Sequence, residues 1–316
     1  KMGNCCTSND SKGEVDFQVS KRATTKLQAG RKDTKIKIDP SLLSGSDSSW
    51  TLLKVLQPNI KKAYDSEPAF DDKPGSDFDT SISRSYHGPE ETSEGGMYEG
   101  YKNVETGARD GLGICVFSDG SVYHGFWKAD KPSGRGIRVF ADTDVYTGTF
   151  LDGKMDGRGR YVNDDGSVYE GEWKNNHQQG QGMQKWPDGS SFSGEWKAGK
   201  KHGKGEFKWK DGSVFKGMFK ADKFDGEGEY KWADGKRYKG EWKEGMMDGK
   251  GVYVWEDGKE YEGEFAKDKR HGYGVFKWNN GKEYKGQWKN GRMHGDGEIL
   301  KNGQVKKGVW EYGKML

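Results

Sequence analysis

A fixed period of 23 residues runs through about two thirds of this chain and constrains its fold more than any other feature. Aromatic residues stand 23 apart without a slip, at Tyr123, Tyr146, Tyr169, Phe192, Phe215, Tyr238, Tyr261 and Tyr284. Each begins the same short pattern, which is an aromatic residue, any residue, Gly, any residue, and then Trp or Phe. A period of this length indicates an array of small supersecondary units rather than one globular core.

The unit that begins at Phe192 predicts two β-strands. Aromatic residues and glycines alternate with polar residues in Phe192-Ser-Gly-Glu-Trp196 and again in Gly203-Lys-Gly-Glu-Phe-Lys-Trp209. A period of two is typical of strands. We expect the six residues between the two segments to close a hairpin. Asp211-Gly212 should then turn the chain into the next unit, because Gly accepts a positive φ at little cost.

The alternation predicts a sheet with one aromatic face and one charged face. Glycines share the aromatic face, so neighbouring rings can cover their bare backbone, a known device in β-sheets. This explains 13% aromatic residues beside only 31% hydrophobic residues. We therefore predict an all-β fold, an elongated single-layer antiparallel meander. Its aromatic face should include Tyr169, Trp173, Phe192, Trp196, Trp209, Tyr238, Trp242, Tyr261, Tyr284 and Trp288.

The repeated pattern resembles the MORN repeat family, whose units read roughly Tyr-x-Gly-x-Trp, then Gly-x-Gly, then Asp-Gly. Residues 169–189 and 238–258 match this pattern almost literally. The resemblance implies nine repeats over residues 98–305, followed by a partial repeat or C-terminal cap at 306–316. Residues 1–97 would form an extended, mostly irregular polar leader. The first unit is two residues longer in its hairpin loop, and atypical end units are typical of repeat arrays.

Composition excludes several classes of protein. The net charge of the 316 residues is only +3, which gives no global case for nucleic-acid binding. The longest apolar stretch, Thr51-Leu-Leu-Lys-Val-Leu56, is far too short to span a bilayer. Three cysteines, two of them adjacent, cannot form a disulfide framework, so we expect a reducing compartment.

The leader holds one segment that is apolar enough to become ordered. Residues 1–62 carry 12 Lys or Arg against 6 Asp or Glu, and residues 63–97 carry 2 against 9. Asp47 or Ser48 could cap a short helix over residues 48–57, before Pro58 interrupts it. That helix would present Trp50, Leu53 and Leu56 on one side. Two interpretations stay open, since this side could pack on the aromatic face of the array or dock another protein.

The start of the chain carries an acylation pattern. Met2-Gly-Asn-Cys-Cys-Thr7 fits the N-myristoylation signature, and Gly3, Cys5 and Cys6 are the lipidation candidates. One myristoyl chain binds membranes only marginally, and a second acyl chain or a basic patch makes the attachment stable. Lys1 precedes Met2, so the motif can act only where the mature chain begins at Gly3.

Residues that resemble catalytic motifs are better explained by the repeat. Gly-x-Gly recurs in every unit, and no helical pattern follows it as a dinucleotide site would require. His202, His271 and His294 all occupy the same position before that pair, which we interpret as part of the hairpin loop. Cys115 stands alone, without the cysteines of a zinc site. The sequence therefore predicts no catalytic residue, no metal site and no cofactor.

The resemblance implies a scaffold or adaptor that mediates protein–protein assembly. Radial spoke head proteins of motile cilia are similar to this chain, which favours a ciliary axonemal or other cytoskeletal complex with protein partners, other MORN proteins among them. Junctophilins are similar in joining such arrays to membranes, so the alternative is an acylated adaptor that binds anionic lipids at the cytoplasmic face of a membrane. A second alternative is a regulatory or targeting subunit of an enzyme complex.

Overall fold

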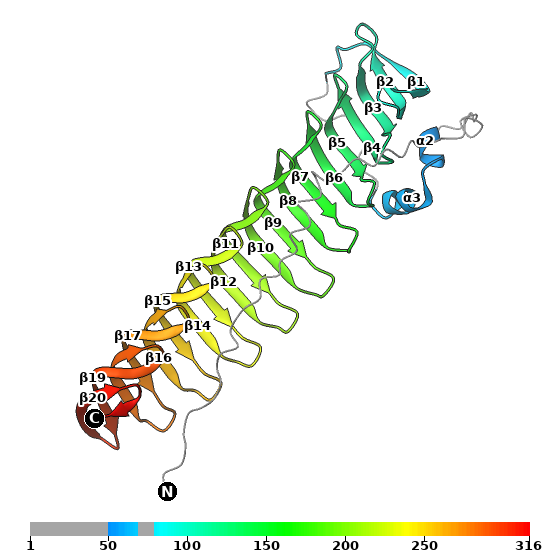
Figure 1. Ribbon diagram of the computed structural model, residues 1–316. Helices are drawn as coiled ribbons and strands as arrows, with labels where there is room; N and C mark the ends of the chain where they lie inside the picture. The colour runs from blue at the N-terminus through cyan, green and yellow to red at the C-terminus, as the bar shows by residue number, and fades with distance from the viewer. Residues whose placement is uncertain (1–49, 69–78) are drawn as a thin grey trace. The chain divides into compact units, whose positions relative to one another are not determined.

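The computed structural model describes residues 50–68 and 79–316, and these residues belong to one compact unit (Figure 1). Within them, 21 strands form a single antiparallel sheet. Every strand pairs with its neighbours in the chain, from β1 with β2 to β20 with β21, so the sheet is a simple meander. The prediction of a single-layer all-β array of hairpin repeats is confirmed.

Hairpins repeat with almost constant strand lengths along the sheet. The first strands are β1 (Arg84–Glu91), β2 (Met97–Asn103), β3 (Arg109–Val116), β4 (Val122–Lys128), β5 (Lys131–Val139), β6 (Val145–Leu151), β7 (Lys154–Val162), β8 (Val168–Lys174), β9 (His177–Lys185), β10 (Ser191–Lys197) and β11 (Lys200–Lys208). They continue with β12 (Val214–Lys220), β13 (Lys223–Lys231), β14 (Arg237–Lys243), β15 (Met246–Val254), β16 (Glu260–Ala266), β17 (Lys269–Lys277), β18 (Glu283–Lys289), β19 (Arg292–Lys301), β20 (Gln304–Glu311) and β21 (Lys314–Met315).

The hairpin loop inside a repeat is much shorter than the sequence suggested. Between β10 and β11 it is only Ala198-Gly199, where six loop residues were expected. Both residues have positive φ, 48° and 78°, as a tight two-residue hairpin turn requires. The prediction was wrong because it treated Lys197 and residues 200–202 as loop, although they belong to β10 and β11. Asp152-Gly153 and Asn290-Gly291 fill the same loop in other repeats, and such pairs are strong hairpin signals.

A longer turn leads from each repeat to the next. Between β11 and β12 it covers residues 209–213, so Trp209 lies in the turn and not in the strand. The Asp211 carboxylate accepts a hydrogen bond from the Ser213 backbone at 2.8 Å, and Gly212 has φ of 90°. The Gly212 N–H donates to the Trp209 carbonyl at 3.0 Å. The Asp-Gly pair thus fixes the turn as predicted, by an Asx hydrogen bond and a left-handed glycine.

One glycine from each strand between β2 and β20 lies directly opposite the glycine of its neighbours. We call this row the glycine ladder, and it consists of Gly100, Gly113, Gly125, Gly136, Gly148, Gly159, Gly171, Gly182, Gly194, Gly205, Gly217, Gly228, Gly240, Gly251, Gly263, Gly274, Gly286, Gly297 and Gly308. The first aromatic residue of each repeat, such as Tyr169, Phe192 or Tyr238, covers this row with its ring. We call these residues the anchor aromatics. A Cβ on Gly182 would lie 2.3 Å from the Tyr169 hydroxyl oxygen.

The anchor aromatics tie each repeat to the next. The Tyr169 ring makes edge-to-face contacts with Trp173 of its own repeat, at 5.2 Å, and with Trp196 of the following repeat, at 5.1 Å. The Tyr169 hydroxyl donates to the Glu172 carbonyl, and the Trp196 indole N–H donates to the carbonyl of Gly182. Each polar tip is thereby satisfied while the ring is buried.

Two short helices precede the sheet. They are α2 (Thr51–Lys54) and α3 (Pro58–Asp65). The sequence predicted one helix over 48–57 that Pro58 would end, but Pro58 instead begins α3. Proline is well placed at the first helical position, because its missing N–H has no partner there in any case. The expected caps, Asp47 and Ser48, lie outside the described residues.

Close packing on the glycine ladder should make it intolerant of any side chain. We expect Gly182→Ala to lower the free energy of unfolding by about 1–3 kcal/mol, because the new methyl group overlaps the Tyr169 ring. Gly88→Ala is the matched control, since a Cβ there meets nothing within 4 Å. Urea denaturation followed by circular dichroism measures both. Equal stability of the two variants would show that the ring does not rest on the backbone.

Candidate interaction surfaces

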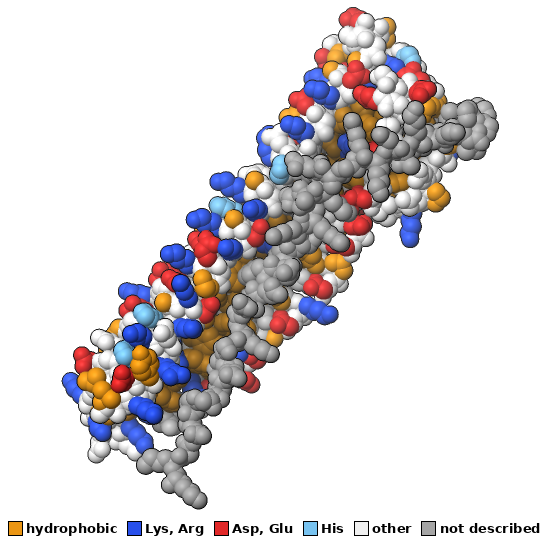
Figure 2. Space-filling view, viewed as in Figure 1, with side chains coloured by type: hydrophobic (Ala, Val, Ile, Leu, Met, Phe, Trp, Pro, Cys, Tyr) orange, Lys and Arg blue, Asp and Glu red, His pale blue; other side chains and the backbone are white. Residues whose placement is uncertain are grey.

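The aromatic residues predicted to form one face are mostly buried. Figure 2 shows hydrophobic side chains gathered in a band along the sheet, with charged side chains beside it. Tyr169, Phe192, Tyr238, Tyr261 and Tyr284 are at most 1% exposed. The tryptophans four residues further on, Trp173, Trp196, Trp242 and Trp288, are 4–7% exposed. These side chains build the array, so they are poor candidates for contact with a partner.

A second row of aromatic rings combines buried rings, at Phe207, Tyr230 and Phe276, with tryptophans that stay partly accessible. We call it the tryptophan ladder, and it consists of Trp186, Phe207, Trp209, Tyr230, Trp232, Tyr253, Trp255, Phe276 and Trp278. Each ring contacts the next, with centroids 4.4–5.5 Å apart. All five tryptophans are partly exposed. Of this row, only Trp209 was predicted on the aromatic face, although the other four tryptophans stand at the same position in their repeats.

Two cations, Lys201 and Arg270, lie on the aromatic face, where the predicted six-residue loop had not placed them. Lys201 is 1% exposed, and its ammonium lies 5.3–5.7 Å from the centroids of four rings. Its nearest acidic partner is Asp222, at 3.8 Å. Burial lowers the pKa of Lys201 to about 8. Arg270 lies likewise against four rings, with its guanidinium carbon 4.5 Å from the Trp288 centroid.

The register of the hairpin shows why these cations point inward. In β10 and β11 the register shifts between Gly194 and Trp196, so that Trp196 pairs with Lys201 on the same face. Simple alternation from Gly203 places Lys201 with the aromatic residues only if strand β11 begins before it. The same position in other repeats holds Met155, Met247 and Met293. This inward-facing position therefore accepts a long side chain that is either charged or apolar.

On the opposite face, glutamates reinforce the bulges. The Glu195 carboxylate accepts a hydrogen bond from the Lys204 backbone at 3.0 Å and lies over Gly203, whose φ is 58°. Glu172, Glu241 and Glu264 make the same contact in their repeats. Some side chains of the charged face therefore stabilise the bulges in addition to facing solvent. His202, His271 and His294, expected in hairpin loops, lie within strands β11, β17 and β19, because the loops are shorter than predicted.

The first repeats carry an apolar patch on that opposite face, and α2 and α3 cover it. The patch consists of Ile114, Val116, Val122, Ile137, Val139 and Val145, together with Leu52 and Ile60 from the helices. Trp50, Leu53 and Leu56, the predicted docking residues, are partly buried against this cluster. The helices therefore pack on the array, but on the face opposite to the aromatic one. Ile114 and Ile137 stand where later repeats carry Glu206 and Glu229, a sequence signal that was missed.

Polar contacts fix the helices over this patch. Glu99 is 2% exposed, and its carboxylate accepts hydrogen bonds from the N–H groups of Thr51 and Leu52 and from the Tyr86 hydroxyl. The Tyr64 hydroxyl lies 2.7 Å from His124 Nδ1. Beyond α3, the Glu67 side chain accepts from Arg160 at 2.5 Å and is only 3% exposed. These contacts hold residues 51–67 against the first three repeats.

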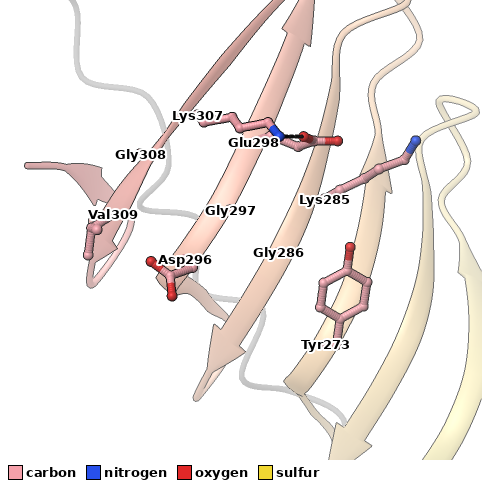
Figure 3. A pocket seen from close by; sticks show the side chains of 9 residues that line it. All are labelled: Tyr273, Lys285, Gly286, Asp296, Gly297, Glu298, Lys307, Gly308 and Val309. Atoms are coloured by element: carbon pink, nitrogen blue, oxygen red, sulfur yellow. Dashed lines mark ion pairs between the residues drawn. The ribbon is translucent and has the colours of Figure 1, made fainter.

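The described residues offer little that could perform chemistry. A shallow depression of about 580 Å³ opens over Gly286, Gly297 and Gly308 on the charged face (Figure 3). Its charged lining includes the ion pair of Glu298 with Lys307 at 3.8 Å. In residues 50–68 and 79–316, no three His, Cys, Asp or Glu side chains are grouped as metal ligands. Burial raises the pKa of the Cys115 thiol to about 12, which makes it a poor nucleophile.

Two sequence predictions concern membranes. The lipidation candidates Gly3, Cys5 and Cys6 lie outside the described residues. In the part of the chain that the structure describes, no helix combines the length and the apolar content needed to cross a bilayer.

Comparison with known proteins gives a clear family. The family model for the MORN repeat matches nine consecutive segments, 107–122, 123–145, 146–168, 169–191, 192–214, 215–237, 238–260, 261–283 and 284–305. The chain belongs to the MORN-repeat family, whose members are generally non-enzymatic repeat scaffolds. A search of curated proteins finds no match.

Solved structures are similar only at a low level. The wild-type TCP10 domain of CPAP from Danio rerio has 13% identity and a TM-score of 0.34, over 69% of this chain and 96% of that one. The TCP domain of SAS-4 (dCPAP) from Drosophila melanogaster, solved in complex with a proline-rich motif of Ana2 (dSTIL), has 10% identity and a TM-score of 0.32, over 48% of this chain and 84% of that one. Similarity this low supports no conclusion about this chain.

The buried lysine predicts an unusual pH dependence of stability. The folded-state pKa of Lys201, about 8, lies below the ordinary lysine value of 10.5. Between these values the unfolded chain binds more protons, so stability should rise with pH, by up to about 1.4 kcal/mol per pH unit. Lys201→Met copies the residue of other repeats and should be more stable at pH 7.5 and lack the rise.

Urea unfolding of both proteins at pH 7.5, 8.5 and 9.5 measures this difference. The range stays below pH 10, because burial raises the pKa of tyrosines such as Tyr284, to about 12, and their ionisation destabilises the fold at higher pH. Parallel pH profiles of the two proteins would show that burial does not lower the pKa of Lys201.

The Glu99 carboxylate should control how firmly α2 is held. Glu99→Ala removes the acceptor of three hydrogen bonds, so we expect the amides of residues 51–54 to exchange at least tenfold faster, equivalent to about 1.4 kcal/mol. Glu262→Ala, the same position in a later repeat, is the control. Hydrogen exchange read by mass spectrometry tests this. Unchanged protection over residues 51–65 would contradict the role given to Glu99.

Proposed function

We propose that this chain is a non-catalytic assembly scaffold in a ciliary axonemal or related cytoskeletal complex, and that its tryptophan ladder holds an extended segment of a partner protein. The observation that supports the proposal is the partial exposure of five regularly spaced tryptophans on a rigid sheet. The anchor rings already cover the glycine ladder, so the second row is not needed for that purpose. Exposed Trp and Tyr are the residues most useful as interface anchors.

The architecture suits such a role. Neighbouring repeats are locked by buried rings and by hydrogen bonds such as that from Trp196 to Gly182, so the tryptophans are carried on a stiff frame. Because the binding surface is already ordered, binding of a partner costs less conformational entropy. Many weak contacts along a line then add up to one specific attachment. Similarity to radial spoke head proteins supports the ciliary setting at the level of the repeat.

Ciliated cells provide the test. Tagged full-length chain should stay with the detergent-insoluble axoneme, and the triple variant Trp209→Ala, Trp232→Ala, Trp255→Ala should move to the soluble fraction. Tyr273→Ala is the control, because this tyrosine is 57% exposed on the opposite face. Circular dichroism of the purified variants verifies folding. Complete loss of the wild-type chain into the detergent-soluble fraction would refute the axonemal setting.

A second candidate is an acylated adaptor at an anionic membrane surface. The segment Met2-Gly-Asn-Cys-Cys-Thr7 and the excess of Lys and Arg in residues 1–62 favour it. Mass spectrometry of the native N-terminus decides the matter. A myristoyl group on Gly3 supports the adaptor, and a free or extended terminus excludes it.

A further inference from the structure

The tryptophan ladder has a linear period that selects among ligand conformations. One tryptophan occurs in each repeat from Trp186 to Trp278, always at the first residue of the turn between repeats. Two strand spacings of about 4.8 Å separate consecutive tryptophans, so the row has a period of about 9.6 Å. The ring steps agree, since Trp209 to Tyr230 is 5.0 Å and Tyr230 to Trp232 is 4.4 Å.

Among regular peptide conformations, polyproline II fits this period best. It has three residues per turn and rises about 3.1 Å per residue, so one face recurs every ~9.3 Å. Over the four intervals of the row, the mismatch is only ~1 Å. A β-strand presents the same face every ~6.7 Å and falls out of register within one repeat. Two turns of α-helix span ~10.8 Å and drift by about 5 Å over the row.

Charges beside the row restrict the ligand further. Lys236 and Lys259 follow Trp232 and Trp255 in their turns, and each pairs with the turn aspartate, Asp234 at 2.7 Å and Asp257 at 2.5 Å.

The last turn differs from these two. It carries Asn280 where the others have aspartate. Its Lys282 ammonium lies 4.3 Å from the Trp278 centroid, without a turn carboxylate to neutralise it. The row therefore ends beside a cation, and a carboxylate of the ligand would complement it.

We infer that the tryptophan ladder binds a proline-rich segment in polyproline II conformation, with proline at every third residue and an acidic residue at the end that reaches Trp278. This inference rests on the proposed function and names the class of partner for the same surface. Proline rings pack on aromatic faces, and a preformed polyproline II helix loses little entropy on binding. Five tryptophans match about thirteen residues of ligand. The period of the tryptophans, about 9.6 Å, agrees with the period of polyproline II, about 9.3 Å.

Synthetic peptides test the inference directly. The probe contains five Pro-Ala-Pro triplets followed by two glutamates, and carries a fluorophore. Its control has the same composition with the triplet period scrambled. Anisotropy with the full-length chain should give at least tenfold tighter binding of the periodic peptide, and affinity should fall when the peptide is cut to two triplets. Equal binding of the periodic and scrambled peptides, or no binding, overturns the inference.

Variants locate the binding. Trp232→Ala should weaken the probe about tenfold, and Trp232→Phe should restore most of the affinity. Tyr273→Ala should change nothing. Replacing the two glutamates with glutamines should weaken binding to the wild-type chain but not to Lys282→Gln. If Tyr273→Ala lowers the affinity for the probe as much as Trp232→Ala does, the probe does not bind at the tryptophan ladder.

The outcome for the proposed function is separate. If the probe fails while the triple tryptophan variant still leaves the axoneme, the scaffold role stands and only the ligand class is wrong. If the wild-type chain is itself fully soluble in detergent-extracted cells, the ciliary scaffold fails whatever the peptide does.

Discussion

Contact between aromatic rings and bare backbone is the interaction on which this array depends. Each anchor ring rests on glycines of its own and the next strand, and a Cβ at Gly182 or Gly205 would lie within 2.6 Å of ring atoms. The rings can pack this closely only because the glycine ladder offers no side chains. In return they cover backbone that strand glycines would otherwise leave bare and weak. A thin sheet with little aliphatic content thereby acquires a continuous buried layer.

This solution leaves two surfaces for recognition, and they lie on opposite faces of the sheet. In the first repeats, the charged face becomes apolar at Ile114 and Ile137 and holds α2 and α3. In the later repeats, the aromatic face gains a second row from Trp186 to Trp278. Asn163 occupies that position in the third repeat, so the row begins only with Trp186. The two halves of the array therefore differ in which face is specialised.

The 23-residue period was enough to predict the sheet, its meander and the burial of residues such as Tyr238 and Trp242. Alternation alone could not locate the β-bulge, because a bulge changes which residues share a face without changing their order. Lys201 was missed for another reason: residues 200–202 were assigned to the hairpin loop, although alternation from Gly203 would place Lys201 with the aromatic residues. The position of α2 and α3 was missed because it depends on tertiary contacts with Glu99 and Ile114, not on local propensity.

The period also limits what the array can recognise. Any residue type placed once per repeat forms a straight row with a step of two strand spacings, about 9.6 Å. The sequence can vary the rings and charges along such a row, as it does at Trp278 and Lys282, but it cannot vary the step without disturbing the glycine ladder. A ligand that touches several repeats must therefore be commensurate with that step. The regular spacing of the glycines thus makes the array selective for ligands that repeat. Polyproline II is the peptide conformation that meets this condition over the four intervals between the five tryptophans.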